Sequence, residues 1–595
     1  MKKSIRYLPV GTIPFLLAAC LFAACGNGSE PRMVTNPGID IDDLRRHVYY
    51  LASEELEGRE AGSPQEAVAA NYIADHFEAF GLLPAGENEY LQEFSFTRGV
   101  RQQPGRVYLE STGVRISTED ELVRAWGISG SGMATGRLVF AGYGIKDSEG
   151  GFDEYRGVDV TGKVVMIMRG NPESDEGADD RDIIRERVRL AEDNGAAAVL
   201  LTVPSHYEGT QSLLPLRYDR LAAPASIPVL QLTRETARIL MEYAAFDLDF
   251  MELEIIRSGE PVSVETDMPV RVVVDLAIER RIARNVIGMV QGTLNPERYI
   301  VVGAHYDHLG FGEHASLYNG PEPRIHAGAD DNASGTAALL ELAHFYAENP
   351  PRYSLLFLAF SAEEMGLLGS EYFMVNPVVP VGNILAMINL DMIGRLTDGQ
   401  LAIFGTGSSD IWDDLIGGIS IEGIEAGLRA TGPGSSDHTS FYVREIPVLH
   451  YFTGTHAEYH RPGDLPELIN YEGLAGVVNH VAQVIDGLNR YEPGDITFTG
   501  TARAPAMTAP GTVTLGVIPD YSYEGDGFRI SGVTPGRVGD LAGFRPGDIL
   551  IAFNDARIAD IYDYMRMMRE FQPGDMLEVT VRRGSEEIVL TVAFE

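Results

Sequence analysis

Apolar runs alternate with amphipathic stretches along the chain between about residues 280 and 490. Four of the runs are typical of buried strands: YIVVGA at 299–304, YSLLFLAF at 353–360, NILAMINL at 383–390 and IPVLHYF at 446–452. A helical stretch, TAALLELAHFYA, lies between the first two. Strands that alternate with helices in this way predict an α/β fold built on a doubly wound, mostly parallel sheet.

Two helical patterns precede this region, at residues 43–58 and 64–83. The second has apolar residues at helical spacing, among them Ile73 and Phe77, and it stops at Gly81. We expect both stretches to belong to the same domain as the strands.

Other parts of the chain have a different pattern. Residues 131–275 contain short strand-like runs and one helical stretch, and residues 511–595 are rich in strands with one helix. Residues 493–510 are rich in Pro, Thr, Gly and Ala, which indicates a linker. The remainder, residues 39–130 and 276–492, is expected to form the main domain.

The N-terminus has the pattern of a targeting segment. A positively charged start followed by an apolar stretch predicts a secretory signal. Two runs of small residues before a cysteine resemble a bacterial lipobox, which implies a lipoprotein signal peptide at residues 1–25, followed by a tether at 26–38. The lipidated residue would be Cys25 or Cys20, and the polar sequence after Cys25 favours Cys25. We therefore expect an exported protein that a lipid anchor holds at a bacterial membrane, on the periplasmic or cell-surface side.

The charge and the cysteine positions narrow the chemistry. The chain has 47 basic and 86 acidic residues, a net charge of −39, which argues against binding to nucleic acid. Its two cysteines both lie in the N-terminal segment, so the rest of the chain offers no disulfides, no thiolate zinc ligands and no cysteine nucleophile. Histidine and carboxylate remain as ligands, and they suit Zn²⁺ or a similar first-row metal.

Candidate ligands follow the ends of the apolar runs. Such positions meet at one edge of an open α/β sheet, where sites are expected. The candidates are His305, the turn GADDNASG at 328–335, the pair Glu363 and Glu364, Asp391, and His460. Each alone could be a helix cap, a surface pair or a core histidine, but their order and their equivalent positions favour one site.

Six motifs in this order carry a specific resemblance: HYDHLG, GADDNASG, SAEEMGLLGS, INLDMIGR, SDHTSFY and GTHAEYHRPGD. They resemble the co-catalytic dizinc aminopeptidases of peptidase family M28. The resemblance implies a zinc exopeptidase fold and two Zn²⁺ ions bridged by Asp331. It implies that Asp331, Glu364 and His460 hold one ion and that His305, Asp331 and Asp391 hold the other.

The resemblance also implies that Glu363 is the general base, which would take a proton from the water bound between the metals. From its position two residues after His305, we expect Asp307 to orient an imidazole. The hydroxyl of Tyr459 could stabilise the oxyanion. Asp437 and His438 are expected to line the substrate side.

The two further regions resemble known modules. Residues 131–275, with AGYGIKD and GKVVMIMRG, resemble a β-rich protease-associated (PA) domain, which could cover the cleft or select substrates. Residues 511–595, with AGFRPGDILIAFNDARI, resemble a PDZ domain. Its loop Leu515, Gly516 and Val517 would bind the C-terminal carboxylate of a peptide. The alternative is a purely structural cap.

Together these features predict an aminopeptidase that hydrolyses N-terminal residues from peptides or proteins, with two zinc ions as cofactors. One alternative is a carboxypeptidase of the same superfamily, for which Arg395 is the nearest basic residue in sequence. Glutaminyl cyclisation on a related site is a more distant alternative. A non-enzymatic, receptor-like protein would show broken ligand positions, and here every position is filled.

Overall fold

The computed structural model describes most of the chain beyond the N-terminal segment. It covers residues 39–595 except 147–150, 173–180, 208–212, 219–222, 319, 321, 431–433, 501–512, 514, 520–522, 524, 534–536, 555, 560, 569–570, 573 and 595. The predicted signal peptide with Cys20 and Cys25, the whole tether and most of the linker lie outside the described residues. Among those described, no helix combines the length and the apolar character needed to cross a bilayer.

The main sheet forms because its central strands are buried on both faces. All residues of β13 (Tyr353–Phe360) and β14 (Ile384–Leu390) are buried, as expected for unbroken apolar runs. Along β12 (Asn295–His305), Ile300 and Val302 join one hydrophobic cluster and Val301 joins another. This alternation places a packed layer on each face of the sheet.

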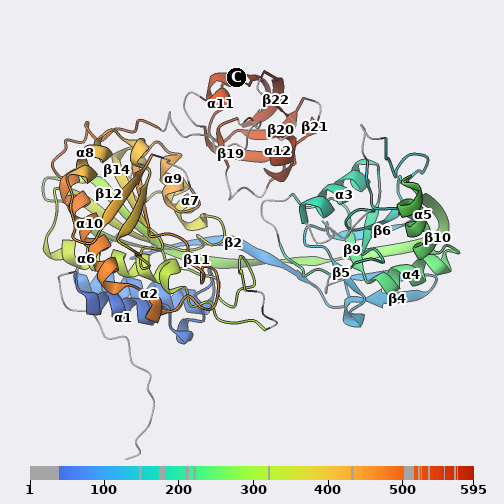
Figure 1. Ribbon diagram of the computed structural model, residues 1–595, viewed down its shortest axis with the longest axis horizontal. Helices are drawn as coiled ribbons and strands as arrows, with labels where there is room; N and C mark the ends of the chain where they lie inside the picture. Colours follow the sequence, from blue (N-terminus) through green and yellow to red (C-terminus); the bar gives the residue numbers. More distant parts are fainter. Residues whose placement is uncertain are drawn as a thin grey trace, which may run out of the picture. The chain divides into compact units, whose positions relative to one another are not determined.

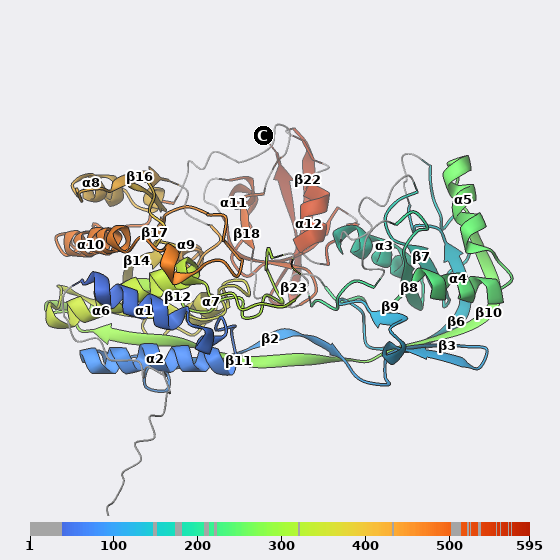
Figure 2. The same ribbon diagram turned by 60° about the horizontal axis from the view of Figure 1, so that its bottom comes forward.

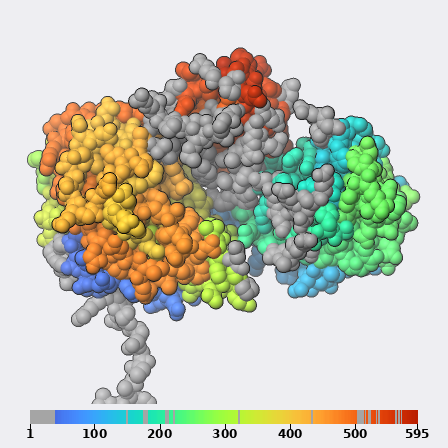
Figure 3. All heavy atoms as spheres, in the orientation of Figure 1, coloured from blue at the N-terminus to red at the C-terminus, as the bar shows by residue number. Residues whose placement is uncertain are grey.

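Helices cover both faces of the sheet. One cluster contains residues from α1 (Ile41–Leu51), α2 (Pro64–Phe80), α6 (Gly335–Glu348) and α10 (Tyr471–Leu488). The other contains residues from α7 (Leu368–Val375) and α9 (His438–Tyr442), and Figure 1 shows these two helices across the strands from α1, α2 and α6. Segments that follow β14, coloured yellow to orange, cover much of the main domain in the view of Figure 3.

The order of the strands is β1-β11-β13-β12-β14-β17-β15-β16, and β2 also pairs with β11. The strands not yet given are β1 (Leu83–Pro84), β2 (Leu91–Gln102), β11 (Leu276–Val290), β15 (Gln400–Phe404), β16 (Glu425–Arg429) and β17 (Val448–Phe452). Figure 2 shows the long antiparallel pairing of β2 with β11.

The sheet is mixed: its centre is parallel, as expected, the strands that join the centre on each side are antiparallel to it, and β15 and β16 are again parallel to each other. β13, β12, β14 and β17 run parallel, whereas β11 joins β13, and β15 joins β17, in antiparallel fashion. Only residues 291–294 separate β11 from β12. That connection is too short for a crossover helix, so β12 returns in the opposite direction.

The starts and stops of the first two helices follow local signals. Asp40 caps α1 by accepting hydrogen bonds from the backbone N–H groups of Asp42 and Asp43. The α-helix ends at Leu51, earlier than the pattern at 43–58 predicts. α2 begins with Pro64 after the Ser63 cap and ends at Gly81, whose φ of 82° is left-handed, as predicted.

A second sheet of eight strands forms the inserted part. Its order is β4 (Val114–Ser117), β3 (Tyr108–Ser111), β10 (Ser263–Val274), β6 (Gly132–Ala141), β7 (Val164–Met168), β8 (Ala198–Thr202), β9 (Val229–Leu232) and β5 (Val123–Ala125). Its helices are α3 (Arg181–Asp193), α4 (Arg234–Tyr243) and α5 (Leu248–Ser258). Because β3, β4 and β5 precede residue 131, this sheet begins earlier than the expected boundary of the insert.

The C-terminal part has a third, antiparallel sheet. Its elements are β18 (Val517–Pro519), β19 (Phe528–Val533), β20 (Ile549–Phe553), β21 (Ala556–Arg557), β22 (Met576–Arg583), β23 (Glu586–Ala593), α11 (Val538–Ala542) and α12 (Ile561–Met568). Leu515 is buried in its core, and Gly516 adopts a left-handed φ of 71° just before β18.

Candidate active site

The ends of the parallel strands bring the predicted residues together. His305 is the last residue of β12, Asp391 directly follows β14, and Glu363 and Glu364 follow β13. Because these strands are parallel neighbours, their carboxyl ends meet at one edge of the sheet. Three buried apolar runs thus fix the place of the candidate chemistry.

Asp331 lies in the segment before α6, and hydrogen bonds to residues of other segments hold its backbone in place. The N–H groups of Asp330 and Asp331 donate to Oδ2 of Asp464, at 2.9 and 3.1 Å. The amide of Asn332 donates to the carbonyl of Leu390 at 2.9 Å, which ties this segment to the end of β14. These bonds leave the carboxylate of Asp331 to meet the histidines.

Asp331 is shared by two groups of side chains. His305 Nε2 lies 3.4 Å from Asp331 Oδ1 and 3.4 Å from Asp391 Oδ1. His460 Nε2 lies 3.2 Å from Asp331 Oδ2 and 3.2 Å from Glu364 Oε2. The structure therefore brings the five predicted ligands into two trios that have Asp331 in common.

The spacing of these atoms suits zinc. Two ligand atoms about 2.1 Å from one zinc ion in tetrahedral geometry are about 3.4 Å apart. The histidine and carboxylate atoms in both trios have this separation. Imidazole and carboxylate are also the ligands that zinc takes when no thiolate is present.

His308, for which the sequence predicts no role, lies in the same site. Its Nδ1 is 2.8 Å from Glu364 Oε1, and its buried Nε2 has no hydrogen-bond partner among the described residues. His308, Asp331 and Glu364 also have atoms close enough together to hold an ion. The available signal was its place in HYDHLG, three residues after His305.

The electrostatics follow from crowding buried carboxylates around imidazoles. Burial disfavours the charge on Asp331, yet hydrogen bonds from His305 and His460 hold the pKa of that carboxyl well below its usual range. Burial, with the neighbouring Glu364 and Asp391, raises the pKa of Glu363 well above its usual range. Buried carboxylates in such excess are stabilised by a cation.

Asp307 bridges the base and the histidine. Its side chain accepts a hydrogen bond from the backbone N–H of Glu363 at 3.1 Å. His305 Nδ1 donates to the carbonyl oxygen of Asp307 at 3.2 Å, whereas the Asp307 carboxylate is 3.7 Å away. The backbone of Asp307, rather than the expected carboxylate, thus makes the hydrogen bond to the imidazole.

The predicted pocket residues surround this centre. Tyr459 stacks on His460 with ring centroids 3.9 Å apart. Burial, together with Asp331 and Glu364, raises the pKa of its hydroxyl, which therefore keeps its proton. Asp437 is fully buried, and burial raises the pKa of its carboxyl to about 7.

The structure also shows the contacts of His438 and Ser436. His438 stacks on His450 with centroids 4.4 Å apart and nearly parallel planes. Ser436, which sequence reasoning missed, donates to Asp391 Oδ2 at 2.7 Å and orients that carboxylate. No sequence signal separates Ser436 from its neighbour Ser435.

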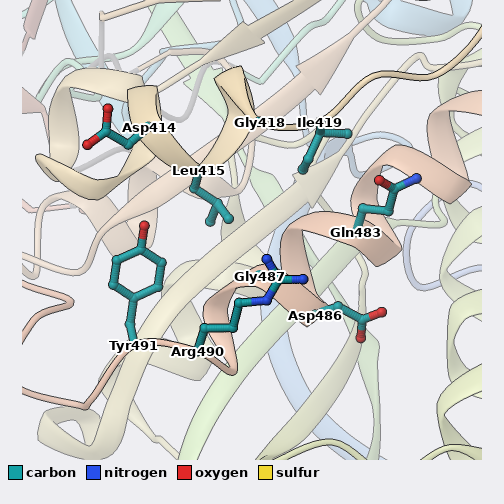
Figure 4. A pocket seen from close by; sticks show the side chains of 9 residues that line it. All are labelled: Asp414, Leu415, Gly418, Ile419, Gln483, Asp486, Gly487, Arg490 and Tyr491. Carbon is teal, nitrogen blue, oxygen red and sulfur yellow. The ribbon is translucent and has the colours of Figure 1, made fainter.

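A cavity of about 330 Å³ lies elsewhere, between α8 (Ile411–Gly417) and the end of α10. Figure 4 shows its lining, which includes Leu415, Ile419 and Arg490. It contains no histidine and none of the predicted site residues, so it does not carry the candidate chemistry.

Two segments of the chain match known protein families. Residues 285–485 match peptidase family M28. This M28 segment contains every predicted ligand and the predicted base. Residues 134–240 match the PA domain. The matches confirm the resemblance of these two segments to the M28 family and to the PA domain. The two-zinc centre stays a prediction, and so does the PDZ assignment, which lies outside the matched residues.

Two named relatives and a solved structure are similar to parts of this chain. Aminopeptidase YwaD of Bacillus subtilis is 25% identical over 328 residues, 53% of this chain and 60% of the relative. An aminopeptidase of Pseudomonas aeruginosa is 32% identical over 208 residues, 33% of this chain and 36% of the relative. The chain therefore covers less than two thirds of the length of either relative. Among solved structures, a zinc aminopeptidase from Bacillus subtilis aligns at 22% identity and a TM-score of 0.46, over 78% of this chain and 99% of its own.

Proposed function

We propose that this protein is a zinc-dependent aminopeptidase that hydrolyses N-terminal residues from peptides. The observation that supports it best is the pair of trios that share Asp331, each with the ligand types and spacing of a zinc site. The M28 match and the relatives named aminopeptidases support the same activity.

Two ions are proposed, with Asp331 between them. His305 and Asp391 would complete the first set, and Glu364 and His460 the second. When bound, two zinc ions supply an activated water and polarise the scissile carbonyl. His308 would orient Glu364 through their 2.8 Å contact.

The chain's own residues would move the proton. Glu363 sits within 4.0 Å of His305 Nε2, beside the proposed metal position, and its backbone is fixed by Asp307. We assign it the role of general base, which takes a proton from the attacking water and delivers it to the leaving amine. Tyr459 keeps its hydroxyl proton and would donate it in a hydrogen bond to the developing oxyanion. Asp437 and His438 would line the substrate side.

The carboxypeptidase alternative is not favoured by the structure. Arg395, the basic residue it would use, is 3.0 Å from Glu458 and 4.0 Å from Asp464. A guanidinium already paired with carboxylates is poorly placed to bind a substrate carboxylate. Nor are the ligand positions broken, as a receptor-like protein would require.

The location and the C-terminal module belong to the proposal as well. A lipid on Cys25, or on Cys20, would anchor the exported protein to a bacterial membrane, and the sequence pattern of residues 1–25 supports it. The PDZ-like part would bind a C-terminal peptide at Leu515, Gly516 and Val517, and the PA domain would cover the cleft or select substrates.

The test compares aminoacyl-4-nitroanilides with N-blocked peptides, using the wild type and Glu363→Gln. We expect wild-type hydrolysis of free N-termini only, about two zinc ions per chain by metal analysis, and a nearly inactive variant that keeps its zinc. Hydrolysis of blocked peptides alone, an unimpaired variant or fewer than two ions would contradict the proposal.

A further inference from the structure

Arg59 is a buried arginine whose side-chain hydrogen bonds to the described residues all go to backbone carbonyl groups. Its side chain is fully buried, and no ion pair is found for it in the part of the chain that the structure describes. Nε donates to the carbonyl of Tyr306 at 2.6 Å, and Nη2 to that of Gly328 at 2.7 Å. Nη1 donates to the carbonyls of Leu51 at 2.9 Å and Ala327 at 2.6 Å.

These carbonyls belong to three separate segments, two of which carry proposed ligands. Tyr306 directly follows His305, and Gly328 lies three residues before Asp331. A guanidinium is planar and presents its donors in a fixed fork, so it can set the relative position of the groups it binds. Arg59 therefore fixes three segments relative to one another: the loop after β12, the loop before α6 and the end of α1.

The backbone around Arg59 is shaped to place it there. Glu57, Gly58 and Arg59 have φ values of 44°, 70° and 41°, a left-handed conformation that side chains other than glycine rarely adopt. A Cβ at Gly58 would lie 2.5 Å from the carbonyl oxygen of His326, so only glycine fits this turn. Such conformations persist where the surroundings determine them, and they gather at functional sites.

The charge of Arg59 also suits this place. Burial lowers its pKa to about 10, and Asp331, Asp307, Asp464 and Glu364 act in the opposite direction. The guanidinium is therefore protonated at neutral pH, and it places one positive charge behind a site rich in carboxylates.

We propose that Arg59 is a positioning residue of the metal centre. Its bonds to Tyr306, Ala327 and Gly328 hold the loops of His305 and Asp331 at the separation that zinc requires. This inference rests on the proposed function, because it assumes that these residues bind zinc.

The test is a zinc titration against a competing chelator, using Arg59→Met and Arg59→Lys. We expect both variants to bind zinc about 10–100-fold more weakly than the wild type, as for other residues that orient ligands. The lysine keeps the charge but loses the fork, so it should not restore affinity. Wild-type affinity in either variant overturns the proposal, whereas a wild type that binds no zinc overturns the proposed function instead.

Arg352→Met is the matched control. Arg352 donates Nε to Asn295 Oδ1 at 2.9 Å and Nη1 to the carbonyl of Tyr491 at 3.4 Å, at the start of β13 rather than at its catalytic end. We expect this variant to bind zinc as the wild type does. If Arg352→Met lost as much zinc affinity as the Arg59 variants, general destabilisation would explain the loss, and the proposal would be overturned.

A measurement on the unmodified protein covers the case in which the Arg59 variants do not fold. Hydrogen exchange is compared between the metal-free and zinc-loaded wild type. Zinc should increase protection at residues 56–60 together with the loops of His305 and Asp331. Unchanged exchange at residues 56–60, with increased protection at the two loops, would overturn the proposal.

Discussion

Two buried clusters of histidine and carboxyl groups lie in the main domain, and they differ in charge. The strand-end cluster is the candidate active site, with His305, His308, His460, Asp331, Glu363, Glu364 and Asp391. The helix cluster lies among α1, α2 and α6. There His47 Nδ1 is 2.7 Å from the hydroxyl of Tyr72, and His47 Nε2 is 3.7 Å from Glu341 Oε1.

The titratable side chains of the helix cluster are neutral at neutral pH, because burial shifts their pKa values. Burial lowers the pKa of His47 to about 3 and that of His76 to about 4, and it raises the pKa of Glu341 to about 8. At neutral pH, imidazoles and carboxyl alike are uncharged and can share hydrogen bonds. His76 donates Nδ1 to the carbonyl of Tyr72 at 2.8 Å, for example.

The strand-end cluster cannot become neutral in the same way. The pKa of Asp331 is held well below its usual range and the pKa of His460 is raised to about 10, so both groups stay charged at neutral pH. Residue type alone therefore does not separate a metal site from a packed core. Buried groups that keep their charge, at a place where parallel strands end, do.

The largest expected effect comes from one carboxyl-to-amide change in each cluster. Glu363→Gln should lower kcat by about 10²–10⁴-fold, because the amide cannot take a proton from water. Glu341→Gln makes the same change in the helix cluster and should leave kcat unchanged. Peptidase assays with zinc analysis of both variants measure these effects. An equal loss of kcat in the two variants would mean that the two clusters do not differ in function.

Zinc removal is the second test. Metal that binds only the folded state stabilises it by about 4 kcal/mol when its concentration is about 1,000 times Kd. A chelator should therefore lower the melting temperature as well as abolish activity, and added zinc should restore both. His76→Gln should keep this zinc-dependent shift and Asp331→Asn should lose it; a shift that survives in Asp331→Asn would place the zinc elsewhere.

The positions of the strand-end residues could be predicted because they depend on simple features. A buried parallel strand reads as an apolar run, and the polar residue that ends it must lie at the sheet edge, as for His305 and Asp391. Gly81 as a helix stop is equally local.

What the sequence did not reveal depends on tertiary contacts. His308 contacts Glu364 from the loop after β12, where an isolated β-bridge pairs His308 with Glu60, far away in the sequence. β3, β4 and β5 are short strands, and nothing in their pattern tells which sheet they join. Arg59 reads as an ordinary surface charge until its carbonyl partners are known.

His308 gives a smaller expected effect within the strand-end cluster. His308→Gln removes the imidazole that contacts Glu364, and we expect zinc affinity to fall by about 10–100-fold. His76→Gln is the matched change in the helix cluster and should leave zinc affinity unaltered. Titration of both variants with zinc checks this, and an unchanged affinity in His308→Gln would show that Glu364 is oriented without it.

The smallest effect is a pH dependence of stability that belongs to the helix cluster. The pKa of Glu341 is about 8 in the folded protein against an ordinary value of 4.5. Between these values the folded state binds more protons than the unfolded chain, so this group makes stability fall as pH rises from 4.5 to 8. His47, with a pKa of about 3 against 6.5, acts in the opposite direction and only below pH 6.5.

The window from pH 6.5 to 8 therefore isolates Glu341 from His47. Over it, Glu341→Gln should gain about 1–2 kcal/mol of unfolding free energy relative to the wild type, because glutamine never has to ionise in the core. Urea titrations of both proteins at the two ends of the window measure the gain. A difference that stays constant across it would mean that Glu341 is ionised throughout, and that the helix cluster, like the strand-end cluster, holds a buried charge in need of a cation.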